Sequence, residues 1–264
     1  MIPKLIASDI DGTMLPPGGT NPSQELTDVL TKYLDAGAVV ALASGRPLSG
    51  LDCLFPSLKD RLLYICSNGT QIVKGGKTLF LSPVAAGDEL RELMEVVRAL
   101  HCEFMVDTAE VTLTEGSVSE PFFQSIKAAG IHVKKIPDIA AIDTPALKIS
   151  IAHPNGPLAL LREPSIARLA DKYTLVPTGG IFFDIIGKNA DKGTAVATVQ
   201  RHFGIKPEET VVFGDAMNDI PMFETTPNGY AVETSPKVVK DHASKTILPP
   251  EQDGLAKCLR DLLH

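Results

Sequence analysis

Short apolar runs alternate with helix-like segments at both ends of this chain, and this alternation limits the folds that it can adopt. Near the amino terminus the runs occupy residues 4–8, 38–43 and 62–66. Between the first two, residues 22–36 carry apolar side chains at the three- and four-residue spacing of a helix. Strands that are apolar on both faces must be covered on both faces, as in a parallel sheet flanked by helices. The same alternation returns over residues 192–263.

The middle of the chain follows a different pattern, in which extended segments are longer and helices separate them less regularly. The extended segments are residues 104–114, 146–153 and 180–186, and the longest helical pattern covers 158–172. This mixture favours a meandering, antiparallel α+β unit over a wound parallel sheet. We therefore expect an α/β protein with a parallel-sheet core of residues 1–82 and 188–264, and an inserted α+β domain of residues 83–187.

The composition argues against several classes of partner. The chain has 264 residues, 25 basic against 32 acidic side chains, a formal net charge of −7 and no Trp. Nucleic acids and anionic membranes bind clustered positive charge, and stacking on bases needs aromatic side chains. No apolar stretch approaches the roughly 20 residues of a membrane helix, and Asp9 and Asp11 interrupt the first apolar run, unlike a signal peptide. We expect no nucleic-acid partner and no membrane partner.

The cysteine pattern bears on the compartment. The four cysteines, at positions 53, 66, 102 and 258, lie far apart and form no CxxC pair. This spacing fits neither a disulfide framework nor a zinc site, and it is typical of a chain in a reducing environment. We therefore expect a cytoplasmic protein. The sequence does not distinguish a monomer from a homodimer.

Two carboxylates follow the first predicted strand. Residues 9–13 read Asp-Ile-Asp-Gly-Thr, and in an open parallel sheet ligands bind beyond the carboxyl ends of the strands. Strand alternation would place Asp9 and Asp11 on the same side of an extended chain, and Gly12 would let the backbone turn. A strand followed by an ordinary Asp-Gly turn explains this segment equally well when it is taken alone.

A second acidic cluster follows another predicted strand, over residues 210–213. Residues 214–219 read Gly-Asp-Ala-Met-Asn-Asp. Asn218 or Asp219 could simply cap the next helix. Two acidic clusters at equivalent ends of one sheet are harder to explain as caps, and together they predict a site of hard oxygen ligands such as Mg²⁺ prefers.

Two further segments predict an anion site at the same edge. Residues 44–46 (Ser-Gly-Arg) offer a hydroxyl and free amides at a predicted helix start, which suits an anion, although a plain turn would look the same. Lys192 lies at a predicted helix start, where a positive charge is unfavourable unless it has a partner, although a solvated lysine is the alternative. Beside a cluster of carboxylates and a metal, such a cation suggests phosphate binding.

Together these segments resemble the four ordered motifs of the haloacid dehalogenase (HAD) superfamily. Residues 67–69 (Ser-Asn-Gly) and 253–254 (Asp-Gly) extend the resemblance over nearly the whole chain. An insert placed between Ser44 and Lys192 resembles the Cof-type phosphatase branch with a C2 (type B) cap. The resemblance therefore implies a Rossmann-like core with an α+β cap that sets substrate specificity. Residues 234–236 (Thr-Ser-Pro) depart from the Asn-Ala pair that is frequent in that branch.

The resemblance also implies a role for each matching residue. Asp9 would attack phosphorus to give an aspartyl-phosphate, and Asp11 would act as general acid and then general base. Mg²⁺ would be bound by the Asp9 side chain, the Asp11 main-chain carbonyl and Asp215. The phosphoryl oxygens would be held by Ser44, Gly45, Lys192 and Asn218, with Gly12, Thr13, Arg46, Asn68 and Asp219 in supporting roles.

The function implied is a Mg²⁺-dependent phosphatase that hydrolyses small soluble phosphate monoesters, with sugar phosphates foremost. A phosphomutase or phosphotransferase would use the same aspartyl-phosphate, and a non-catalytic module would only bind phosphate. Three basic residues of the insert, Lys148, His153 and Arg162, could meet an anionic leaving group, although structural or solvated roles are the simpler expectation.

Overall fold

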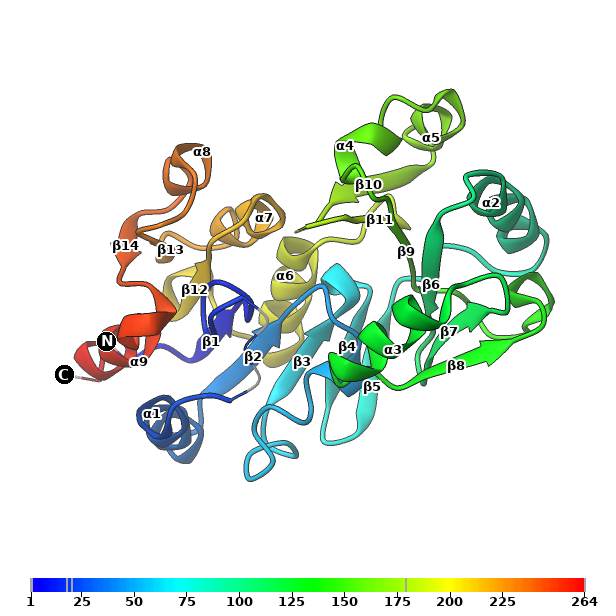
Figure 1. Cartoon of the computed structure of the whole chain (residues 1–264). Helices are drawn as coiled ribbons and strands as arrows, with labels where there is room; N and C mark the ends of the chain where they lie inside the picture. Colours follow the sequence, from blue (N-terminus) through cyan, green and yellow to red (C-terminus); the bar gives the residue numbers. More distant parts are fainter. Residues whose placement is uncertain (1, 18, 20, 179, 264) are drawn as a thin grey trace.

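Two β-sheets organise the chain in the computed structural model, which describes residues 2–17, 19, 21–178 and 180–263 (Figure 1). The large sheet has the strand order β14-β13-β12-β1-β2-β3-β4-β5, and the small sheet has the order β10-β11-β9-β6-β7-β8. The strands of the large sheet are β1 (Leu5–Ser8), β2 (Val39–Ala43), β3 (Leu63–Cys66), β4 (Gln71–Lys74), β5 (Lys77–Leu81), β12 (Thr210–Gly214), β13 (Gly229–Val232) and β14 (Lys245–Ile247). Those of the small sheet are β6 (Glu103–Asp107), β7 (Thr112–Glu115), β8 (Val133–Ile136), β9 (Lys148–Ala152), β10 (Tyr173–Pro177) and β11 (Phe182–Gly187).

The large sheet is parallel from β14 to β3, as the apolar runs predict, and antiparallel at its β4–β5 edge. Leu5 of β1 is in register with Val39 of β2 and with Thr210 of β12. Strands from the first and the last third of the chain therefore lie side by side at the centre of the sheet. The β4–β5 hairpin is absent from our sequence-based prediction. Its signal is the Gly75–Gly76 pair, both with positive φ, because Gly-Gly is a strong two-residue hairpin turn.

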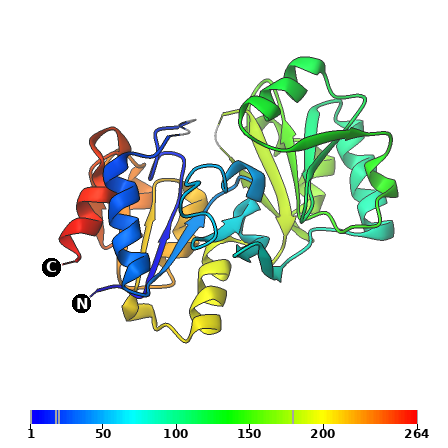
Figure 2. The same ribbon diagram turned by 90° about the horizontal axis from the view of Figure 1, so that it is seen from below.

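Helices cover both faces of the large sheet (Figure 2). Alternate residues of β1 point to opposite sides: Ile6 belongs to one buried apolar cluster, and Leu5 and Ala7 belong to another. The first cluster takes in α1 (Gln24–Asp35) and α9 (Gly254–Asp261). The second takes in α6 (Lys192–Phe203), α7 (Ile220–Phe223) and α8 (Lys237–Lys240). This is the doubly covered α/β arrangement that strands apolar on both faces require.

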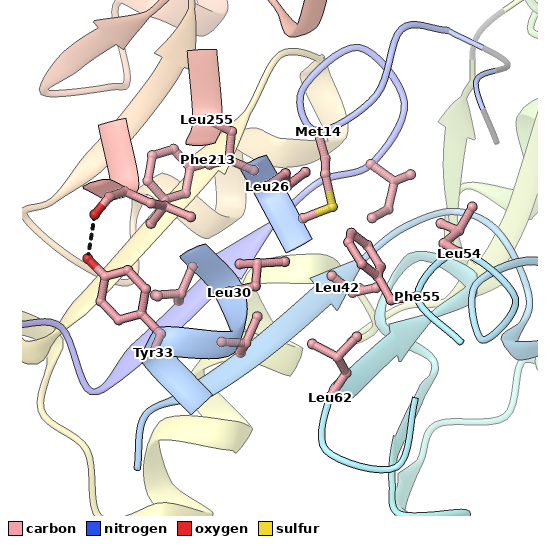
Figure 3. Packing of buried hydrophobic residues seen from close by; sticks show 14 of the residues in the cluster. Met14, Leu26, Leu30, Tyr33, Leu42, Leu54, Phe55, Leu62, Phe213 and Leu255 are labelled. Carbon is pink, nitrogen blue, oxygen red and sulfur yellow. Dashed lines mark hydrogen bonds between the residues drawn. The ribbon is translucent and has the colours of Figure 1, made fainter. Parts of the chain in front are cut away.

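The core on the α1 side is closed by a hydrogen bond as well as by apolar packing (Figure 3). Leu30 and Tyr33 of α1 are fully buried, and the Tyr33 hydroxyl donates to the Leu259 carbonyl of α9 at 2.8 Å. Burial raises the pKa of Tyr33 to about 12, so the hydroxyl keeps its proton for this bond. The first and last helices are therefore joined beside the same sheet.

The region between the two halves of the large sheet is only partly as predicted. The single helix expected over residues 158–172 is wrong, because two short helices, α4 (Pro157–Leu160) and α5 (Pro164–Leu169), stand there. Pro164 lacks an amide proton and would clash with the preceding turn, so α4 cannot continue past it. The longer helices of this region are α2 (Gly87–Ala99) and α3 (Glu120–Ala128). Within the described residues, no helix combines the length and hydropathy needed to cross a bilayer.

The small sheet has two chemically different faces. Val106, Ile149 and Phe183 are buried in an apolar cluster that also contains residues of α2. Strand alternation puts Asp107, Lys148 and Asp184 on the opposite face, and in register Lys148 pairs with Asp107 while Asp184 pairs with Ser150. This polar face contacts the loops that follow β2 and β3 of the large sheet, through Gly45, Ser67 and Asn68.

Candidate functional site

The predicted site residues gather where neighbouring parallel strands of the large sheet end. Asp9 follows β1, Ser44 follows β2, Ser67 follows β3 and Asp215 follows β12. The carboxyl ends of parallel strands lie at one edge of a sheet, which is where open α/β folds bind ligands. Lys192 joins them from the first turn of α6, whose N-cap is Asp191.

Lys192 lies between two carboxylates at the centre of this edge. Its Nζ donates to Asp9 Oδ1 at 2.5 Å and to Asp219 Oδ1 at 2.6 Å, and its side chain is only 1% exposed. Burial alone would lower the pKa of Lys192, but the charges of Asp219 and Asp9 outweigh it and raise the pKa. The two carboxylates therefore favour the charged form of Lys192. Its burial between them rules out the alternative of a solvated surface lysine.

Three carboxylates converge beside this cation. One oxygen from each of Asp9, Asp215 and Asp219 lies within 4.8 Å of the other two. Burial raises the pKa of Asp9 well above its ordinary value despite Lys192, and the charges of Asp219 and Asp215 raise it further. Burial also raises the pKa of Asp215, against a hydrogen bond from Thr13 and together with repulsion from Asp219. Buried oxygens that repel one another fit a divalent cation with oxygen ligands, such as Mg²⁺.

Asp219 has a structural task in addition. Its Oδ2 accepts hydrogen bonds from the amides of Asp215 and Ala216, both at 2.9 Å. With Lys192 on its other oxygen, Asp219 fixes the loop after β12 and the cation together. Asp9 and Asp215 are therefore the better metal ligands of the three, because their carboxylates are less occupied by protein donors.

Gly12 and Thr13 hold Asp215 in place. Thr13 Oγ1 donates to Asp215 Oδ1 at 2.7 Å. Gly12 has φ +95°, and a Cβ there would lie 2.4 Å from Asp215 Oδ2. Only glycine satisfies both the backbone conformation and this close approach, so the Asp-Gly pair is more than a turn signal.

Asp11 lies outside the group of three carboxylates that Asp9, Asp215 and Asp219 form. Its side chain is 35% exposed and pairs with Arg46, whose Nε donates to Asp11 Oδ2 at 2.8 Å and whose Nη2 contacts Oδ1. The reason is that β1 ends at Ser8, so the alternation of an extended strand no longer applies at position 11. Arg46 is therefore tied to Asp11 and not turned to open solvent.

The remaining predicted residues form a connected set of loops. The Ser44 carbonyl accepts from the Asn68 amide at 2.9 Å, and Asn68 Oδ1 accepts from Asn218 Nδ2 at 3.1 Å. Gly45 meets the small sheet, because its carbonyl accepts from Lys148 Nζ at 2.6 Å. Lys148 is thus buried and structural, as the simpler expectation had it. Asp107 and Asp184 also reach these loops, as shown below. The sequence did not predict them, because each lies in an apolar strand pattern with no motif around it.

Replacing Lys192 by methionine tests the buried ion pairs. Removing one member of a buried pair leaves uncompensated charge, so we expect the free energy of unfolding to fall by about 3–5 kcal/mol in metal-free buffer. Urea unfolding measures it. Lys237→Met is the matched control, because Lys237 is 85% exposed in its pair with Asp241 and should change stability little. A Lys192→Met protein as stable as the control would contradict the role given to the cation.

Comparison with known proteins agrees with this geometry. The chain matches the haloacid dehalogenase-like hydrolase family over residues 6–259. It is 26% identical over 232 residues to an HMP-PP phosphatase of Serratia proteamaculans (strain 568), covering 86% of this chain and 82% of that protein. It is 22% identical over 281 residues to the 5-amino-6-(5-phospho-D-ribitylamino)uracil phosphatase YitU of Bacillus subtilis (strain 168), covering 98% and 97%. The HAD subclass IIB sugar phosphatase BT4131 shares the fold with a TM-score of 0.82 at 20% identity, covering 98% of both chains.

The family match includes both segments of the large sheet and the whole of the small sheet. It therefore spans Asp9, Ser44, Lys192 and Asp215, which the fold brings to one edge. The chain belongs to the haloacid dehalogenase-like hydrolase family, in its Cof-type branch, and is a phosphoric monoester hydrolase.

Proposed function

We propose that this protein is a Mg²⁺-dependent phosphatase that hydrolyses small soluble phosphate monoesters through an aspartyl-phosphate on Asp9. The observation that carries the proposal is the buried Lys192, which bridges Asp9 and Asp219 beside the Asp215 carboxylate. Sugar phosphates are the first substrate class to test. Residues 83–187 form the cap in this proposal, and they contain the small sheet, which contacts the loops after β2 and β3.

The reaction has two displacements at phosphorus. In the first, a carboxylate oxygen of Asp9 forms a bond to phosphorus while the bond to the leaving oxygen breaks, and Asp11 gives that oxygen a proton. In the second, Asp11 takes a proton from water, the water oxygen attacks phosphorus, and Asp9 leaves as a carboxylate with inorganic phosphate as product. In this structure both oxygens of Asp11 contact Arg46, which orients this carboxyl group.

The surrounding residues neutralise and hold the phosphoryl group. Asp9 and Asp215, with the Asp11 main-chain carbonyl, would hold Mg²⁺, which when bound offsets the charge that keeps an anionic nucleophile from an anionic ester. Lys192 keeps Asp9 oriented and presents its cation to the phosphoryl oxygens. Ser44, Gly45 and Asn218 contribute hydrogen-bond donors from the loops around them.

The relatives support a small phosphorylated metabolite as substrate. One is named for HMP-PP, one for a phosphoribitylamino-uracil, and the structural neighbour is named a sugar phosphatase. All three are phosphatases, so their names favour hydrolysis over phosphoryl transfer between sugar positions. The formal net charge of −7 agrees with a phosphate site built from local cations and not from an extended basic surface.

A panel of purified phosphate esters tests the proposal. We expect inorganic phosphate from several sugar phosphates and from an aryl phosphate in the presence of Mg²⁺, with kcat/KM on the order of 10⁴ M⁻¹s⁻¹ or more for the preferred ester. Phosphate release and sugar-phosphate isomer formation are measured in the same samples. Isomer formation without phosphate release would establish the phosphomutase alternative, and no turnover of any ester would leave only a binding module.

A further inference from the structure

A buried group of charged residues in the small sheet holds the loops of the site. We name it the clamp, and it consists of Asp107, Lys148 and Asp184. Lys148 Nζ donates to the Gly45 carbonyl at 2.6 Å, and lies 3.3 Å from Asp107 Oδ2 and 3.6 Å from Asp184 Oδ2. The clamp therefore connects three strands of one sheet to a loop of the other.

The two carboxylates of the clamp reach the turn after β3. Ser67 Oγ donates to Asp107 Oδ2 at 2.8 Å, and Asn68 Nδ2 donates to Asp184 Oδ2 at 2.8 Å. The opposite oxygen of each carboxylate is bound within the small sheet, by Thr112 for Asp107 at 2.7 Å and by Ser150 for Asp184 at 2.6 Å. Each carboxylate is thus fixed from both sides.

The clamp is too well enclosed to serve as an ordinary surface contact. Asp107, Lys148 and Asp184 are at most 3% exposed. Burial raises the pKa of Asp184 in spite of Lys148, and the two carboxylates raise the pKa of Lys148 against the effect of burial. A buried ion cluster is weak evidence for stability in itself, because desolvation offsets much of the attraction. A geometric task is the better explanation.

The turn held by the clamp is conformationally unfavourable by itself. Ser67 and Asn68 are non-glycine residues with φ of 49° and 59°, and such a left-handed pair persists where its surroundings hold it. The next residue, Gly69, has φ +95°, and a Cβ there would lie 2.2 Å from the Asp191 carbonyl, at the start of the helix that carries Lys192. The turn at residues 67–69 therefore packs directly against Asp191, the N-cap of the helix that carries Lys192.

The same turn is bonded to the other loops of the site. The Ser67 amide donates to the Arg46 carbonyl at 2.8 Å, and the Asn68 amide donates to the Ser44 carbonyl at 2.9 Å. Asn68 also accepts from Asn218 at 3.1 Å. A displacement of Asn68 would consequently move two of the segments that bind phosphate in the proposed mechanism.

We propose that Asp184 and Lys148 are positioning residues, which set the geometry of the phosphate-binding loops through Asn68 and Gly45 and do not contact the leaving group. This proposal rests on the phosphatase function proposed above. The proposal distinguishes residues that position the phosphate-binding loops from residues that select the substrate. A residue that selects the substrate must contact the leaving group, which differs between esters. A positioning residue acts on the binding of the phosphoryl group, which all esters share, so its loss should affect every ester alike.

The experiment compares Asp184→Ala with Glu115→Ala across the ester panel. Glu115 is also a carboxylate of the small sheet, 8% exposed and paired with Arg98, but its bonds go to Arg98 and the Ile139 amide and not to the large sheet. We expect Asp184→Ala to lower kcat/KM about 10- to 100-fold for every ester, because small misplacements of binding groups have effects of that size. The order of preference among esters should stay unchanged, inhibition by inorganic phosphate should weaken, and Glu115→Ala should stay near wild type.

The alternative results are distinct. A loss of kcat/KM that changes the order of the preferred esters would show that Asp184 contacts the leaving group. An equal loss in Glu115→Ala would show that the effect comes from a general loss of stability in the small sheet and not from the clamp. Either result overturns the proposal. Should Asp184→Ala fail to fold, Asp184→Asn keeps the volume but exchanges a charge-assisted hydrogen bond for a neutral one, with an expected uniform loss of about three- to tenfold.

A readout besides activity keeps this proposal separate from the phosphatase assignment. Hydrogen exchange of the amides in residues 67–70 should accelerate in Asp184→Ala and stay slow in Glu115→Ala, whatever the protein catalyses. An inactive wild type would refute the proposed function, while the exchange result would still decide whether the clamp holds the turn. Unchanged exchange in Asp184→Ala would refute the clamp even in a fully active enzyme.

Discussion

Asp9→Asn is expected to lower kcat for an aryl phosphate by on the order of 10⁴-fold or more, because an amide cannot form the phosphorylated intermediate. The loss should appear in kcat with every ester of the panel, since Asp9 acts on the phosphoryl group alone. Initial rates of phosphate release with Mg²⁺ in excess measure it. Turnover within a few-fold of wild type would remove Asp9 as the nucleophile and the aspartyl-phosphate with it.

The fold should survive this substitution. Burial raises the pKa of Asp9, so its ionised form is disfavoured in the metal-free fold, and the stability that the protonated form gives is lost as the pH rises through that pKa. Asparagine removes this pH dependence, still accepts a hydrogen bond from Lys192 and leaves the Lys192–Asp219 pair in place, so Asp9→Asn should still unfold cooperatively in chelator at neutral pH. Asp60→Asn, at an exposed position in the turn before β3, is the matched control and should keep full activity.

Removal of divalent cations is expected to abolish turnover, and added Mg²⁺ should restore it. The physical reason is the group formed by Asp9, Asp215 and Asp219, whose mutual repulsion Lys192 offsets only in part. Phosphate release is measured in excess chelator and again after titration with Mg²⁺. A rate that ignores the chelator would contradict the proposed metal requirement.

Binding of Mg²⁺ can also be measured without turnover, from its effect on the stability of the folded protein. At a Mg²⁺ concentration about 100 times its dissociation constant, the folded state should gain about 2.7 kcal/mol, which raises the unfolding temperature. Asp215→Asn should lose most of that gain, because it removes a ligand and a charge. Asp241→Asn is the control for a lost surface carboxylate, since among the described residues Asp241 forms its ion pair with the exposed Lys237. Equal gains in both variants would place the ion elsewhere.

The fold of the large sheet was largely predictable because its signals are local. Apolar runs such as residues 39–43 are buried on both faces, and such runs require helices on both sides. The positions of Asp9, Ser44 and Asp215 followed from the same signal, since each comes directly after a strand. Local signals also failed in places: Pro164 divided an expected helix, and the Gly75–Gly76 turn was overlooked.

What the sequence determined by itself is the alternation of strands and helices in the large sheet, and with it the placement of Asp9 and Asp215 at the carboxyl edge of that sheet. The tertiary structure alone decided their partners. Asp11 turned to Arg46 because the strand had already ended, and Lys148 and Asp184 met loops 103 and 116 residues away. Periodicity records which face of a strand is apolar, but a buried charge is stable only beside a specific partner, and that partner is fixed when distant segments pack together.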